Sequence, residues 1–383
     1  MFKNLKIFLS SNQIIALVIL FILLSFSALL EILGVGIIPV FISAVLDHEL
    51  LNIYLTKINI TSLNFLIEIP QDKLLTYMTI FIIILYVFKN FFLLFVNYLQ
   101  SFFSYKVTVY NSERLYKKYL FSDFSYHLEK NSSTLVKNIA HEIGGATTFI
   151  MNILSLVREL IIFVFISILL LINSPKGFVY IALVLLLFLI LFYFLIKNKI
   201  KSSSKKVFES REQFIFSVQQ SLSFIKELIL LDKRNIFYEY FKKKLKIKES
   251  QHVFMEVVTK VPRLTFELLA VLICLLLVNY FFETSKNQLL PILSLYGIGL
   301  IRMIPSYTQI SSSLVNLRFY KLPFDFICAE IEKENRVNSK KNNVDDFNLP
   351  KYTKDHVIKI NQLSFGYNEN ENILENLNFT IKA

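Results

Sequence analysis

Apolar runs long enough to cross a lipid bilayer alternate along this chain with polar stretches that keep helical periodicity. The six apolar runs cover residues 14–45, 74–99, 149–172, 178–196, 262–282 and 289–317. The hydrocarbon core of a bilayer accommodates about 20 helical residues, so each run is long enough to form one transmembrane helix. The pattern therefore predicts an all-α membrane protein with six transmembrane helices and long extensions outside the membrane.

The longest polar stretch, 197–263, separates the fourth and fifth apolar runs. It holds 16 of the 41 Lys and Arg residues of the chain and seven acidic residues. As a helical hairpin, its two arms of about 30 residues would each extend roughly 45 Å. Arms of this kind suit the transmission of motion between a membrane domain and a cytoplasmic one.

The distribution of positive charge predicts how the chain is oriented. The three expected outer connections hold four Lys and no Arg, whereas the two expected inner ones hold 22 Lys and Arg residues. Basic residues remain on the cytoplasmic side during membrane insertion. We therefore expect a multi-pass protein of the cell (inner) membrane, with its N-terminus and C-terminus both cytoplasmic.

Composition excludes several other classes of protein. With 54% apolar and 18% charged residues in 383, the chain is too hydrophobic for a soluble protein. The net charge of +12 could suggest nucleic acid, but the basic residues flank the apolar runs, so no nucleic-acid partner is expected. Two cysteines give neither a disulfide framework nor a metal site, and His141-Glu142 lacks the second His of a zinc motif.

The C-terminal part differs in pattern from the rest. Residues 321–356 indicate a linker, and 357–383 contain two segments with alternating apolar and polar positions, typical of β-strands. Two strands do not form an independent domain. We expect 1–320 to be the membrane domain and 357–383 to be the first two strands of a larger, truncated domain.

Several motifs carry a resemblance to a known family. They are NSSTLVKNIAHEI after the second run, SFIKELILLDKRNIFYEYF in the long excursion, VPRLTFELLAV at the fifth run, IRMIPSYTQISSSL in the sixth, and the strand pair HVIKINQLSFGY and ILENLNFTIKA. Together with the six runs, these resemble a half-transporter of the type I ABC exporters. The shorter motifs are similar to the branch that flips lipid-linked oligosaccharides.

The resemblance implies a homodimer with a coupling helix at the end of each inner excursion, near 122–128 and 228–237. The alternative is that both excursions are solvated helical hairpins. ATP and Mg²⁺ are implied as cofactors, with Tyr367 stacking on adenine; the alternative is that Tyr367 is an ordinary residue at a strand end. The chain has no G-x-x-x-x-G-K-[ST] loop. We therefore expect no ATP hydrolysis by this chain alone, and a nucleotide-binding domain supplied in trans or by an untruncated chain.

Ionisable residues inside apolar runs are costly, and they usually face a cavity or a partner. Those in this chain are Glu31, Lys89, Arg158, Glu159, Glu267 and Arg302. The hypothesis is that Lys89, Arg158 and Arg302 bind the head of a polyprenyl-pyrophosphate-linked glycan, because guanidinium groups bind phosphate oxygens well. The apolar outer loop at 50–69 would contact its lipid tail. The alternative is snorkelling, or pairing with Glu31 and Glu159, and Glu267 could pair with Arg263.

The leading functional interpretation is the membrane half of an exporter that moves a large amphipathic anion by ATP-driven alternating access. An exporter of a drug, a peptide or another lipid is the nearest alternative. A second alternative is a truncated, non-functional remnant. A passive channel or secondary transporter fits less well, because such proteins have no evident use for the excursion at 197–263.

Overall fold

The computed structural model describes residues 2–46, 71–173, 175–284, 289–341, 358–366 and 372–381. This part of the chain is mostly helical and ends in a two-stranded sheet. Six helices have more than 30 residues each: α2 (Ser11–Leu46), α4 (Gln71–Leu120), α7 (Ile143–Asn173), α8 (Pro175–Ser223), α10 (Arg234–Thr284) and α11 (Leu289–Lys341). The shorter elements are α1 (Phe2–Phe8), α5 (Phe124–Glu129), α6 (Ser132–Lys137), the π-helix η2 (Asn138–Glu142), α9 (Ile225–Leu230), β1 (Ile358–Phe365) and β2 (Leu374–Ile381).

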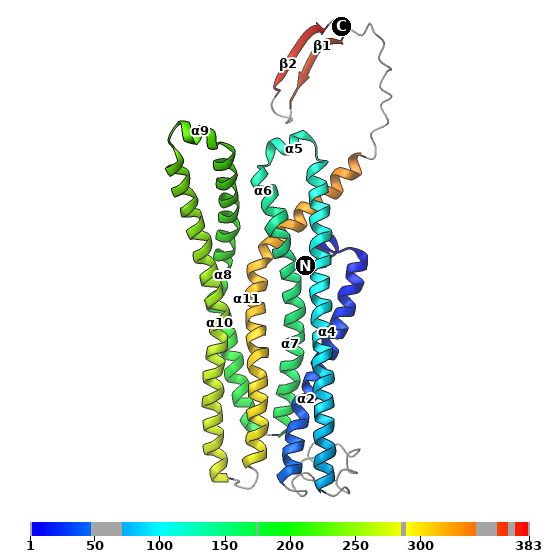
Figure 1. Ribbon diagram of the computed structural model, residues 1–383, viewed down its shortest axis with the longest axis vertical. Helices are drawn as coiled ribbons and strands as arrows, with labels where there is room; N and C mark the ends of the chain where they lie inside the picture. Colours follow the sequence, from blue (N-terminus) through cyan, green and yellow to red (C-terminus); the bar gives the residue numbers. More distant parts are fainter. Residues whose placement is uncertain are drawn as a thin grey trace.

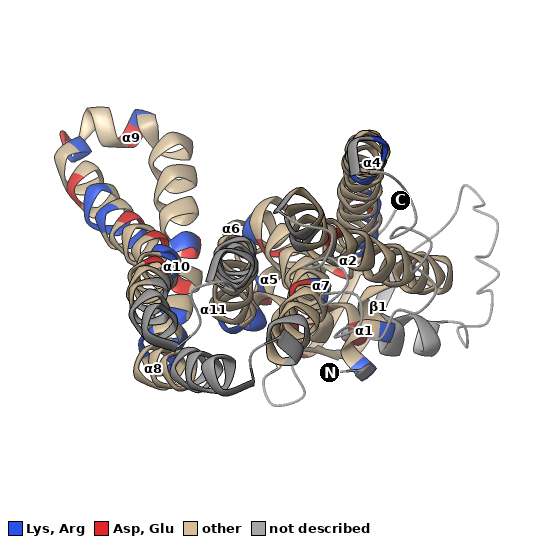
Figure 2. Ribbon diagram, turned by 90° about the horizontal axis from the view of Figure 1, so that it is seen from below, with Lys and Arg blue, Asp and Glu red and all other residues tan. Residues whose placement is uncertain are grey.

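The long helices run roughly parallel to one axis and give the molecule an elongated shape (Figure 1). The short helices α5 and α9 lie at the same end of this bundle: α9 joins α8 to α10, and α5 connects α4 to α6. Seen along the axis, the hairpin of α8, α9 and α10 stands apart from α2, α4 and α7, and basic and acidic residues are interspersed along it (Figure 2). The bundle thus has one compact part and one projecting arm.

Three of the described helical stretches are long and apolar enough to cross a membrane. They are Ser11–Ile42, Lys73–Leu120 and Ser132–Ile168, with mean hydropathies of 2.7, 2.4 and 2.2. The apolar window of the second is only 6% buried, and side chains such as Phe91 and Leu94 are 71% and 66% exposed. An apolar surface of that extent requires lipid or another protein around it, which agrees with a membrane protein.

Helix α11 joins the two parts of the bundle. Its Phe324, Ile327, Cys328 and Ile331 are buried against α1, α4 and α7, while its Val315 and Phe319 are buried against α8 and α10. The rings of Phe324 and Phe149, on α7, stack with their centroids 4.6 Å apart. Two of the apolar core clusters in the described chain therefore share this one helix.

The positions of the helices agree with the apolar runs, but their ends differ in three places. Helix α7 ends at Asn173 and α8 begins at Pro175, so the turn expected between them is shorter than 173–177. Proline is well tolerated in the first helical turn, where its missing N–H has no intrahelical partner. Helix α10 runs straight through Pro262, and α11 continues to Lys341, into the segment expected to be a linker.

The remaining local features are the two strands, the start of α6 and the outer loop. The two strands are confirmed: β1 and β2 pair antiparallel, with Ile358 opposite Ile381. Helix α6 begins after Asn131, whose side chain makes no capping hydrogen bond. The apolar outer loop at 50–69 lies outside the described residues.

Gly145 allows the close approach of α7 and α11. A Cβ atom at Gly145 would lie 3.3 Å from the Pro323 Cβ and 3.3 Å from the Tyr320 Cδ1, both on α11. At the neighbouring Gly144, a Cβ atom would meet nothing within 4 Å. The same substitution made at Gly145 and at Gly144 is therefore a matched test of this contact.

We expect Gly145→Leu to lower the free energy of unfolding by about 1–3 kcal/mol, because the larger side chain must push two packed helices apart. Gly144→Leu adds the same side chain on the exposed face and should not destabilise the protein. Thermal unfolding in detergent, followed by far-ultraviolet circular dichroism, measures both. Equal effects of the two substitutions would contradict the role of the contact.

Candidate functional site

Three charged residues, which we call the charged cluster, lie where α2, α4 and α7 meet, within their apolar stretches: Glu31, Arg158 and Glu159. Arg158, on α7, has its Nη2 atom 3.4 Å from the Glu31 Oε1 of α2 and its Nε atom 3.8 Å from the Glu159 Oε1. The side chains of Arg158 and Glu31 are only 17% and 7% exposed. The Nε atom is buried and forms no hydrogen bond within the described residues. The guanidinium is thus neutralised by carboxylates but incompletely hydrogen-bonded.

Lys89 reaches the same three-helix region from α4. Its Nζ atom lies 4.2 Å from the centre of the Tyr86 ring, in a cation–π contact. The Tyr86 hydroxyl donates a hydrogen bond of 3.0 Å to the carbonyl oxygen of Gly34 on α2. Since Gly34 follows Glu31 by one helical turn, Lys89 and Arg158 approach adjacent turns of α2 from different helices.

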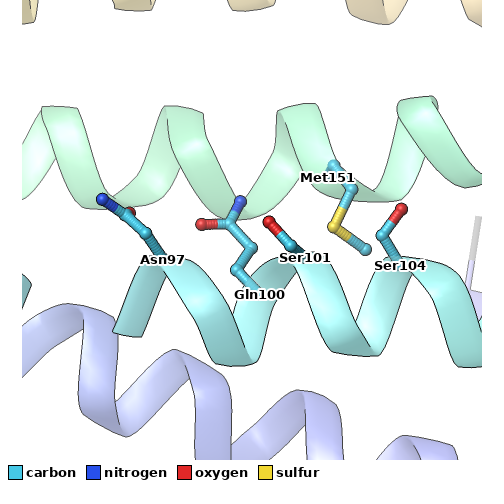
Figure 3. A pocket seen from close by; sticks show the side chains of 5 residues that line it. All are labelled: Asn97, Gln100, Ser101, Ser104 and Met151. Carbon is cyan, nitrogen blue, oxygen red and sulfur yellow. The ribbon is translucent and has the colours of Figure 1, made fainter. Parts of the chain in front are cut away.

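A polar groove runs along α4 opposite α7 (Figure 3). It has a volume of about 410 Å³ and is lined by Asn97, Gln100, Ser101 and Ser104 of α4 and Met151 of α7. The four polar residues recur at helical spacing, so they form one stripe on α4. We call these five residues the polar groove.

The polar groove and the charged cluster lie close to each other along the helices. Thr108 donates a hydrogen bond of 3.2 Å to Thr147, which sets the antiparallel register of α4 and α7. Counting the same number of residues forward from Thr147 along α7 and back from Thr108 along α4 puts Arg158 level with Asn97 to within about one turn. The end of the polar groove at Asn97 therefore lies at about the same level along the helices as Arg158 of the charged cluster.

The structure brings together two of the predicted substrate-binding residues. Lys89 and Arg158 share the region around α2, and Arg158 is paired as the alternative interpretation expected. Arg302 lies in α11, but its side chain is outside the described residues. Arg263 and Glu267 are both exposed, and no ion pair between them occurs in the described part of the chain.

Sequence reasoning missed the polar groove, although its signal was present. Positions 97, 100, 101 and 104 follow the i, i+3, i+4 and i+7 spacing of one helical face. They were interpreted as the end of the second apolar run and the start of its polar continuation. The stripe lines a groove only because α7 packs opposite it, and that packing depends on tertiary structure.

The described residues do not fit ATP or Mg²⁺ as a bound cofactor. Strands β1 and β2 carry no glycine-rich loop whose N–H groups could surround phosphates, and Tyr367 lies outside the described residues. Within the described ranges, no group of three or more His, Cys, Asp or Glu side chains gathers as metal ligands would. No nucleotide chemistry is assigned to the described part of this chain.

A second group of charges connects the first excursion to α8 and α11, far from the charged cluster. It consists of three ion pairs: Lys118–Glu330 at 2.9 Å, Lys137–Glu212 at 2.6 Å and Arg211–Glu142 at 3.0 Å. The Lys137 side chain is fully buried, with its Nζ atom 3.7 Å from the centre of the Phe208 ring. We call these three pairs the ion-pair joint.

The carboxylates of the ion-pair joint differ in pKa. Burial alone would raise the pKa of Glu330, but hydrogen bonds from Tyr126 and Lys118 hold it below its ordinary value. Hydrogen bonds from Lys137 and Thr134 likewise outweigh burial and lower the pKa of Glu212. Burial raises the pKa of Glu142 in spite of Arg211. The joint is therefore most stable when Glu330 and Glu212 are ionised.

Comparison with known protein families gives no match to this chain. The resemblance to the ABC exporters thus stays a prediction from its motifs. The features that the structure shows are the charged cluster, the polar groove and the ion-pair joint.

Glu330 and Glu332 offer a matched test of the ion-pair joint. Glu330→Gln leaves the buried Lys118 without its counter-charge and should cost about 3–5 kcal/mol of stability at neutral pH. Glu332 pairs at 2.9 Å with Lys3, whose side chain is 74% exposed. Glu332→Gln should therefore cost less than about 1 kcal/mol.

The effect of Glu330→Gln should depend on pH. Because the folded-state pKa of Glu330 lies below its ordinary value of 4.5, its stabilisation is complete above that value. It is lost as the pH falls through the lower folded-state pKa. Unfolding monitored by circular dichroism at neutral and acid pH should show the two proteins converging in acid; a constant difference would rule out an ionised Glu330.

Proposed function

We propose that this chain is the membrane half of an ABC-type exporter that flips an amphipathic anion, such as a polyprenyl-pyrophosphate-linked glycan, across the inner membrane. One observation carries the proposal. Two short helices, α5 and α9, occupy one end of the bundle close to where the motifs predict coupling helices, and both expose large apolar side chains.

The lengths of the helices support a protein that transmits motion. Helices α8 and α10 have 49 and 51 residues. Helices of this size are about 75 Å long, more than twice the roughly 30 Å of a hydrocarbon core. They would cross the membrane and carry α9 far into the cytoplasm, in the orientation that the distribution of basic residues predicts.

The apolar surfaces of α5 and α9 suit docking by a nucleotide-binding domain. Leu230 and Leu231 at the end of α9 are 76% and 67% exposed, Phe121 directly after α4 is 70% exposed, and Phe124 at the start of α5 is 66% exposed. Apolar side chains of this size at the end of a long polar arm are typical of a protein interface. The partner would contact both helices and move them together.

The strand pair β1–β2 supports the identity of that partner. Ile358, Phe379 and Ile381 are 55%, 46% and 50% exposed on this small sheet. A hairpin with so much exposed apolar surface needs further strands or helices to cover it. In the proposal, these belong to the nucleotide-binding domain, on this chain or on another polypeptide.

The charged cluster and the polar groove support an anionic substrate with a polar head. The buried Arg158 Nε atom has no hydrogen-bond partner in the part of the chain that the structure describes, and a pyrophosphate oxygen would provide an acceptor for it. Phosphate would compete with Glu31 and Glu159 for the guanidinium. The amides and hydroxyls of the polar groove would hydrogen-bond the hydroxyls of a glycan.

The proposal is tested by transport in proteoliposomes that contain the chain with a nucleotide-binding domain and a fluorescent lipid-linked glycan. We expect ATP-dependent movement of the glycan between leaflets, and its loss in Arg158→Ala and Arg302→Ala because the pyrophosphate loses its cations. Lys205→Ala, on the exposed face of α8, is the control and should transport normally. Unchanged flipping in both arginine variants would refute the substrate assignment, and no ATP-dependent transport of any amphipathic anion would refute the function.

Docking is tested separately at the tip of α9. The double variant Leu230→Asp/Leu231→Asp should weaken binding of the nucleotide-binding domain about tenfold or more, because it puts charge into an apolar contact. Lys226→Asp adds a carboxylate to the same helix at a polar position and should have a much smaller effect. Affinity is measured by biolayer interferometry, and circular dichroism checks that the helices persist.

A further inference from the structure

A basic hollow lies between α1 and α4, outside the charged cluster and the polar groove. It has a volume of about 450 Å³, and its polar lining comes from Lys3, Lys6, Ser10 and Ser11 on one side and Tyr110 and Arg114 on the other. Three cationic side chains and three hydroxyls thus surround one space. None of these residues takes part in the proposed transport chemistry.

The hollow has a rigid frame. Arg114 donates a hydrogen bond of 3.1 Å from Nη1 to the carbonyl oxygen of Ile7, which fixes α1 to α4. At the start of α2, the Ser10 N–H donates to the Gln13 Oε1 at 3.0 Å and the Gln13 N–H donates to the Ser10 Oγ at 3.3 Å. This capping box fixes the turn between α1 and α2. The lining residues are therefore held in place before any ligand binds.

The helix register puts the hollow at the edge of the apolar layer. The Gln13 Nε2 atom donates a hydrogen bond of 3.4 Å to the carbonyl oxygen of Lys106, so the start of the apolar run in α2 is level with Lys106 in α4. Tyr110 and Arg114 lie one and two turns farther along, about 6 and 12 Å beyond that level. The head-group region extends about 5–7 Å outside the hydrocarbon core, so it reaches the level of Tyr110 and ends short of Arg114.

The charges facing the hollow are predominantly positive. Lys3 is paired with Glu332 at 2.9 Å, and Asn4 binds Asp325 on the side of α1 that packs against α11. Lys6 is exposed and has no ion-pair partner among the described residues. An anion entering the hollow would therefore meet the exposed Lys6 first, with Lys3 and Arg114 beside it, both already bonded within the protein.

We propose that this hollow binds the phosphate group of an anionic phospholipid in the leaflet that surrounds the start of α2. Phosphate oxygens would accept hydrogen bonds from lysine and hydroxyl donors, and the acyl chains would lie beside the exposed apolar faces of α2 and α4. A lipid is favoured over free phosphate because the hollow opens at the depth of the head groups, next to apolar surface that acyl chains can cover.

The test measures lipid binding to the purified chain in detergent by native mass spectrometry. Phosphatidylglycerol should bind saturably and more tightly than phosphatidylcholine, which has the same acyl chains and no net charge. Lys6→Gln should weaken phosphatidylglycerol binding about fivefold, and Lys3→Gln/Lys6→Gln about 25-fold, from the usual contribution of one lysine near an anionic membrane surface. Lys6→Arg keeps the charge and should restore binding.

Lys117→Gln is the matched control, because Lys117 lies on α4 outside the hollow and should leave binding unchanged. Glycerol phosphate, which has the head-group chemistry without acyl chains, should bind far more weakly than the lipid. The proposal is overturned if the double variant binds phosphatidylglycerol as tightly as the original chain, or if glycerol phosphate binds as tightly as the lipid. Since the readout is binding, its failure would leave the transport proposal standing.

Discussion

The packing of α11 against two different sets of helices is the interaction on which the rest of the structure depends. On one side, Phe324 stacks on Phe149 of α7, where Gly145 lets the two backbones come close. On the other side, Phe319 packs against α8 and α10. Without these contacts, the projecting arm would have little to hold it to the helices that carry the charged cluster. The ion-pair joint adds a second, polar connection between the same parts.

Much of the fold could be predicted from the sequence because lipid restricts what a chain can do. A backbone inside the hydrocarbon core must satisfy its own hydrogen bonds, so each apolar run becomes a continuous helix. Helix ends were harder to predict. Pro262 lies inside α10 although proline usually interrupts a helix, and α11 continues to Lys341 through residues whose composition resembles that of a linker.

The candidate site could be predicted only in part, because charge is visible in a sequence and pairing is not. Lys89 and Arg158 stand out as ionisable residues in apolar runs, but only the packing of α2 between them brings Glu31 and Gly34 into contact with them. The polar groove and the ion-pair joint depend on the register between helices distant in sequence. Lys137 illustrates this: its burial beside Phe208 of α8 follows from tertiary packing alone.

The length of the α8–α10 arm has a geometric consequence. When a stiff rod tilts about a point in the membrane, the displacement of its far end grows with its length. In the proposed membrane orientation, an arm of about 45 Å beyond the bilayer would move α9 by roughly 8 Å on a tilt of about 10°. A small displacement of these helices close to the pivot therefore corresponds to a shift of several ångströms at the tip, and a large movement of the tip corresponds to a small one near the pivot.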